Sequence, residues 1–161
     1  MKKLLSTIFI ISLFIGIQSK SFAHCEVPCG IYNDELRIAM LYEHFTTLEK
    51  AMSKINELWA AEEKNYNQIV RWTTTKEDHA NEIQHVVTQY FITQRVKLPE
   101  TTEGETYDKY VKQLSALHAV IVYAMKAKQT TDKSYIEKLR SSLAEFEAVY
   151  FEGKHRHKIE E

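Results

Sequence analysis

The fold is decided by residues 34–58, which read DELRIAMLYEHFTTLEKAMSKINEL. Large apolar side chains recur in this stretch at spacings of three and four, the period of one buried face on an α-helix. They are Ile38, Leu41, Phe45, Leu48, Met52 and Ile55. Asn33 or Asp34 can cap such a helix, and Asp34 and Glu35 in its first turn suit the helix dipole. We therefore expect a helix over residues 34–58.

The same period continues through three later stretches and predicts helices over residues 66–96, 106–127 and 133–152. Polar links separate them, and Pro99 disfavours helical geometry in the residue before it. Four amphipathic helices with short connections predict an all-α protein, an antiparallel up-and-down four-helix bundle over residues 33–153. The side chains expected along the inward-facing stripe of each helix are, in chain order, Ile69, Trp72, Lys76, His79, Ile83, Val86 and Tyr90 in the first of these helices; Tyr107, Tyr110, Leu114, Leu117, Ile121 and Met125 in the second; and Tyr135, Leu139, Leu143, Phe146 and Tyr150 in the third.

Residues 1–23 have the pattern of a secretory signal peptide. Lys2 and Lys3 precede an apolar run over residues 4–17, and Ser21-Phe22-Ala23 supplies small residues before a cut. The run is shorter than the roughly 20 residues that span a membrane, although a retained anchor helix is the alternative. We therefore expect an exported chain, periplasmic or secreted, that begins at His24.

Composition limits the partners of the processed chain. Removing residues 1–23 from the 161 leaves 138 residues, the size of one domain. Three lysines leave with the leader, so 18 basic residues stand against 22 acidic ones and the net charge is −4. This charge argues against nucleic acid and against an anionic membrane as partners of the mature form.

Residues 24–32, His-Cys-Glu-Val-Pro-Cys-Gly-Ile-Tyr, contain both cysteines of the chain, and we call them the hook. A free His24 would offer its α-amine, whose pKa of about 7.7–8.0 allows a metal to displace the proton, and its imidazole. Cys25 adds a thiolate and a backbone nitrogen, and Cys29 adds a second thiolate. Pro28 and Gly30 allow the chain to fold back. Two nitrogen and two sulfur donors near one plane suit nickel(II) or copper(II).

Two other interpretations of the hook remain open. A Cys25–Cys29 disulfide in a structural helical protein is the usual fate of two cysteines in an exported chain. An exported nickel or copper carrier would use the same donors without turnover.

The hook resembles the metal-binding hook of nickel superoxide dismutase in all six fixed positions: His24, Cys25, Pro28, Cys29, Gly30 and Tyr32. The resemblance implies an enzyme that converts superoxide to dioxygen and hydrogen peroxide with one nickel per chain, alternating between Ni(2+) and Ni(3+). It implies metal ligands at His24, Cys25 and Cys29, with the imidazole as an axial ligand. Tyr32 would stand near the metal, restrict access and order the small molecule. The family's assembly implies a homo-oligomer, a ring of six subunits.

The surroundings of the hook depart from that family. Ala39 and Met40 fall where the family places a carboxylate that holds the axial imidazole, so Glu43, one turn later, is the candidate substitute. His79 stands at the position of the family's arginine, and Pro28 fixes the turn. We therefore name Pro28, Glu43 and His79 as residues around the ligands. Lys76 and His79 would approach the hook, or else lie at a helix end that dips into solvent.

Two further groups of charged residues are candidates for minor roles. The candidates for attracting the superoxide anion are Lys76, Arg71 and Lys97. The alternative is that all three are ordinary surface charges. The polar tail, residues 154–161, contains His155 and His157. A metal-binding tail is the alternative to a solvated end.

Overall fold

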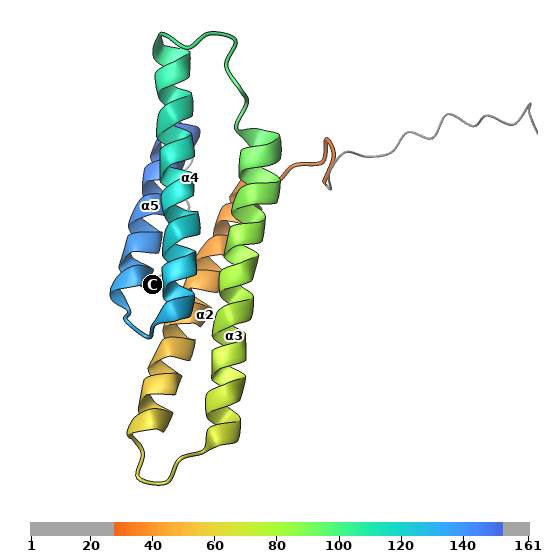
Figure 1. Ribbon diagram of the computed structural model, residues 1–161. Helices are drawn as coiled ribbons and strands as arrows, with labels where there is room; N and C mark the ends of the chain where they lie inside the picture. Colours follow the sequence, from red (N-terminus) through yellow and green to blue (C-terminus); the bar gives the residue numbers. More distant parts are fainter. Residues whose placement is uncertain (1–27, 153–161) are drawn as a thin grey trace, which may run out of the picture.

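The computed structural model describes residues 28–152 and is helical wherever it has regular structure. Its elements are α2 (Asp34–Ala60), α3 (Tyr66–His85), the π-helical segment η1 (Val86–Arg95), α4 (Glu105–Gln129) and α5 (Ser134–Tyr150). Figure 1 shows them as an antiparallel bundle, with η1 continuing the line of α3. The predicted up-and-down four-helix bundle is confirmed, and the helices begin and end within two residues of the expected positions.

Side chains that precede the helices fix where they begin. The Asn33 side chain accepts a hydrogen bond from the backbone nitrogen of Leu36 at 3.0 Å, which confirms one of the two predicted caps of α2. Asn65 does the same for Gln68 at 3.1 Å at the start of α3. Gly104 precedes α4 with a φ of 88°, a conformation that glycine adopts without strain.

The core lies along the axis of the bundle. α2 packs most extensively against α3, and α4 against α5, while contacts of α3 with α4 and of α2 with α5 close the bundle. The predicted α2 stripe is buried from Ile38 to Met52, and only Ile55 is partly exposed. Phe91 and Phe146, with ring centroids 5.1 Å apart, join η1 to α5 within the core.

The predicted stripe of α4 is partly wrong. Its buried line runs through Gln113, Ala116, Leu117, Val120, Ala124 and Ala127, about one residue ahead of the expected line, and only Leu117 is common to both. Met125 is exposed, and Tyr110, Leu114 and Ile121 lie at the edge of the core. Alanines make up half of the buried line, so the period of the large apolar side chains does not mark it.

The π-helical segment was not predicted. Within η1 the side chain of Thr93 donates to the carbonyl of Thr88 at 2.7 Å, and the backbone nitrogen of Val96 donates to the carbonyl of Phe91 at 2.8 Å. The backbone bond has the i→i+5 spacing of a π-helix, and the side-chain bond spans the same number of residues. Residues five apart therefore fall on nearly the same face of this segment, and Tyr90 and Arg95 are such a pair.

Within residues 28–152, no helix is long and apolar enough to cross a membrane.

Candidate metal centre at the start of the bundle

The last residues of the hook lead directly into α2. Pro28 is partly buried, Cys29 is exposed, and Gly30 has a φ of 76°, the left-handed region that favours glycine. The Cys29 thiol can therefore reach a metal ion from the solvent side. His24 and Cys25 lie outside the described residues, and so do the leader at 1–23 and the tail at 154–161 with His155 and His157.

Asp34, the first residue of α2, is the centre of a hydrogen-bond cluster that joins three elements. Its carboxylate accepts two bonds from Arg95, at 2.8 Å from Nε and 2.6 Å from Nη2, in the paired geometry that is strongest for a guanidinium. The hydroxyls of Tyr90, at 2.7 Å, and of Tyr150, at 2.8 Å, donate to the same carboxylate. We call Asp34, Tyr90, Arg95 and Tyr150 the anchor cluster.

The cluster shifts the pKa values of its members. Burial alone would raise the pKa of Asp34, but the hydrogen bonds from Arg95, Tyr90 and Tyr150 outweigh it and hold that pKa below 3.8, its ordinary value. Burial and the Asp34 carboxylate raise the pKa of Tyr90 to about 12, and they raise the pKa of Tyr150 as well. The Asp34 carboxylate and the Arg95 guanidinium are therefore both charged at neutral pH.

Tyr32 rests on the anchor cluster. The Arg95 guanidinium lies 4.3 Å from the centroid of the Tyr32 ring, within the range of a cation–π contact. The Tyr90 ring meets the Tyr32 ring edge to face, with centroids 5.9 Å apart. Tyr32 keeps 39% of its surface exposed. The cluster thus holds this tyrosine at the end of the bundle, three residues after Cys29, with one side open to solvent.

A small cavity of about 60 Å³ lies beside the hook. Pro28 lines it from the hook side, Arg37 from α2, and the end of α3 and the start of η1 close it. The remaining lining residues are His85, Val86, Gln89 and Tyr90.

Glu43 and His79 lie further along the bundle. Glu43 is exposed, nine residues after Asp34, so it is about 14 Å along the axis of α2. The His79 and His44 rings face each other with their Nδ1 atoms 2.8 Å apart. Burial, then the neighbouring His79, lower the pKa of His44, whose Nε2 atom is buried and has no partner among the described residues. The structure brings His79 to His44, and the role of Glu43 and His79 toward His24 stays a prediction.

Lys76 does not lie in solvent. Its side chain is buried, and its ammonium group donates to the carbonyls of Ala127 at 3.0 Å and Thr130 at 3.4 Å, and also to the carbonyl of Lys128. Lys76 therefore satisfies carbonyls at the end of α4, away from the start of α2, and neither interpretation made from the sequence describes it.

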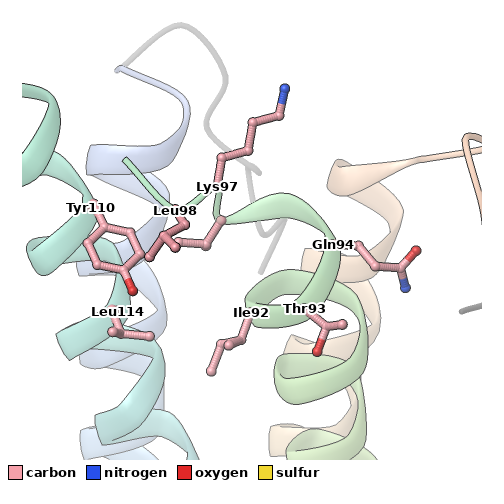
Figure 2. Close-up of a pocket in the computed structure, with 8 residues that line it drawn as sticks. Ile92, Thr93, Gln94, Lys97, Leu98, Tyr110 and Leu114 are labelled. Carbon is pink, nitrogen blue, oxygen red and sulfur yellow. The ribbon is translucent and has the colours of Figure 1, made fainter. Parts of the chain in front are cut away.

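The other two candidates for anion attraction lie on the surface. Arg71 is exposed on α3, well before the anchor cluster. Lys97 is exposed beside a separate cavity of about 370 Å³ between the end of η1 and α4. Figure 2 shows the Lys97 side chain extended away from Ile92 and Leu114, which line that cavity.

The donor chemistry of the hook fits nickel. Residues 28–152 hold no group of three or more His, Cys, Asp or Glu side chains that could bind a metal ion. Cys29 is exposed, and the other donors of the hook, His24 and Cys25, are its close neighbours in sequence. Thiolates with an amine, an amide nitrogen and an imidazole are donors that nickel accepts.

A helical bundle that begins five residues after an exposed cysteine, with further possible donors just before that cysteine in the sequence, fits the class of metalloprotein that binds its metal at one end. A family model described as nickel-containing superoxide dismutase matches residues 19–154, which include the hook and the bundle. The chain belongs to this family, and it is a nickel-containing superoxide dismutase, an oxidoreductase. No curated protein and no solved structure matches the chain significantly.

Sequence reasoning missed the anchor cluster and Arg37. It identified Asp34 as a residue for capping and for the helix dipole, and it gave no role to Arg95, near the end of the helix expected over residues 66–96. The two are 61 residues apart, and the π-helical segment that brings Arg95 and Tyr90 to one face is not visible in the apolar period. One available indication was that Asp34 lies two residues after Tyr32, the last residue of the hook. Any side chain that pairs with Asp34 therefore lies near the hook.

Proposed function

We propose that this dismutase binds its nickel at a processed N-terminus. The ligands are the α-amine and imidazole of His24, the backbone nitrogen and thiolate of Cys25, and the thiolate of Cys29, with one nickel per chain. The observation that carries the proposal is the family match over residues 19–154, because the matched range includes every one of these donors. The exposure of Cys29 also supports it.

When bound, nickel supplies one-electron chemistry between Ni(2+) and Ni(3+), so that one superoxide loses an electron and a second gains it. The second half of the reaction also consumes two protons and yields hydrogen peroxide. The chain restricts what reaches this centre. Tyr32, which Arg95 and Tyr90 hold three residues after Cys29, would restrict access to the metal, and its hydroxyl would order a small molecule by hydrogen bonding.

Export and assembly complete the proposal. Removal of residues 1–23 exposes the His24 amine, which a longer chain would keep as an amide with no basic lone pair. The processed chain acts outside the cytoplasm, in the periplasm or in the medium. Six copies form the assembly. The exposed side chains of Ile31 and Leu36 beside the hook support contacts between subunits, because they leave apolar surface there.

The amine ligand is tested by inserting one alanine between Ala23 and His24 and confirming the new N-terminus by mass spectrometry. The inserted residue moves the amine away from the thiolates. We expect the purified variant to lose its nickel, measured by elemental analysis, and more than about 100-fold of its dismutase activity.

The matched control carries one alanine after Glu161 and should keep both nickel and activity. Full activity in the variant with the N-terminal insertion would contradict the ligand set. Bound nickel without activity in the unaltered protein would favour a carrier, and a Cys25–Cys29 disulfide without metal would favour a structural protein.

A further inference from the structure

The cavity beside Pro28 is lined by an arginine whose charge is not balanced by any carboxylate of the described residues. Arg37 lines it, and no Asp or Glu forms an ion pair with this residue anywhere in the range 28–152. Among the described residues, the one hydrogen bond of its side chain runs from Nη1 to the sulfur of Met40 at 3.6 Å, and thioether sulfur is a weak acceptor. By contrast, the charge of the Arg95 guanidinium is paired with the carboxylate of Asp34.

Arg37 is held in place without being neutralised. Its guanidinium carbon lies 5.1 Å from the centroid of the Tyr90 ring, a cation–π contact. Tyr90 is itself fixed, because its hydroxyl donates to Asp34 at 2.7 Å. An aromatic face orients the guanidinium and leaves its outer N–H groups available to an anion.

The cavity has the size and the donors for a small anion. Its volume of about 60 Å³ is several times the roughly 10–15 Å³ that a cavity needs to hold one water molecule, so the recess has room for a diatomic or triatomic anion. The Gln89 amide and the His85 imidazole add groups that can donate hydrogen bonds. Pro28, which also lines the cavity, precedes Cys29 directly.

We propose that this cavity is a binding site for small monovalent anions and that Arg37 is the residue that draws superoxide to the hook. The inference rests on the proposed function, since it concerns the approach of that enzyme's substrate. It replaces Lys76, whose ammonium group is occupied at the end of α4. A positive group in a recess raises the local concentration of an anion and its rate of association, and added salt weakens the effect.

The kinetic test compares Arg37→Gln with Lys126→Gln in the nickel-loaded protein. Both variants lose one positive charge, but Lys126 is exposed on α4, 21 residues after Glu105, about 31 Å along that helix. At low ionic strength we expect R37Q to lower kcat/KM about three- to tenfold at unchanged nickel content, and the difference to shrink as salt is added. K126Q should stay within about twofold of the unaltered protein, and R37K should retain most of the activity.

A binding measurement tests the site without turnover. In the nickel-loaded protein, the NMR signal of the Arg37 side-chain Nε–H group is followed while sodium nitrate is added at constant ionic strength. We expect the Arg37 signal to shift and then saturate, both in the unaltered protein and in K126Q. The signal of the Gln89 side-chain amide should shift in the same way in these two proteins and should not shift in R37Q. A shift that never saturates, or equal kcat/KM values for R37Q and K126Q, would overturn the inference.

The two proposals fail separately. If the unaltered protein dismutes superoxide but R37Q behaves as K126Q does, the anion site is wrong and the nickel hook stands. If the unaltered protein has no dismutase activity, the proposed function is wrong, and the nitrate titration still decides whether the cavity binds anions.

Discussion

At the scale of single residues, Asp34 joins the hook to the bundle. One carboxylate at the start of α2 receives two bonds from Arg95 and one each from Tyr90 and Tyr150. Arg95 then supports the Tyr32 ring, so the carboxylate acts on the hook through a second residue. The sequence identified Tyr32 and Cys29 because their spacing belongs to a motif, whereas the partners of Asp34 depend on tertiary structure.

The variant Asp34→Asn tests the anchor cluster. It removes the charge from four hydrogen bonds and leaves the Arg95 guanidinium unpaired, so we expect the free energy of unfolding at pH 7 to fall by about 2 kcal/mol. Chemical denaturation measures it. The control Glu49→Gln, also on α2, breaks a more exposed ion pair with Arg140 of α5 at 3.5 Å and should cost less than about 0.5 kcal/mol.

The same variant should change the dependence of stability on pH. Folding lowers the pKa of Asp34 below 3.8, so its contribution is complete above that value and is lost as the pH falls through the folded-state pKa. The stability of the unaltered protein should therefore approach that of D34N as the solution is acidified below pH 3.8. A difference between the two proteins that stays constant through this range would contradict the assignment.

At the scale of the elements, the positions of the helices were predictable because each has an apolar period and a polar link. The π-helical segment was not, because residues 86–95 contain buried side chains that suit either helical repeat. The stripe on α4 was placed wrongly because alanines form much of its buried line. The contacts of Lys76 could not be predicted because they are distant in sequence. Its ammonium group donates to carbonyls at the end of α4, the first of them 51 residues further along the chain.

The variant Lys76→Met tests the role of Lys76 as a cap for α4. Methionine fills the space of the lysine stem but leaves the carbonyls at the end of α4 without their donor. We expect the free energy of unfolding to fall by about 2 kcal/mol, while activity per bound nickel stays unchanged. Lys112→Met, on the exposed face of α4, is the control and should alter stability by less than about 0.5 kcal/mol. Equal stabilities would contradict the capping role.

At the scale of the whole molecule, the last residues of the hook lead into one end of the bundle. Three of its elements meet in the anchor cluster, and α2 begins within five residues of Cys29. The helical core could be predicted because burial repeats along the chain. The family could be predicted because the motif positions of the hook are close together in sequence, and the ligand set itself stays a prediction. The anchor cluster and the cavity lined by Arg37 lie where the hook meets the bundle, and their residues come together only in the folded chain.

The most direct test is the intact mass of the exported, nickel-loaded chain, taken together with its nickel content and a count of its reduced thiols. Our account predicts a polypeptide that begins at His24, binds one nickel ion and has no bond between Cys25 and Cys29. An active enzyme that begins at any other residue, or one in which these two sulfurs are joined, would contradict it.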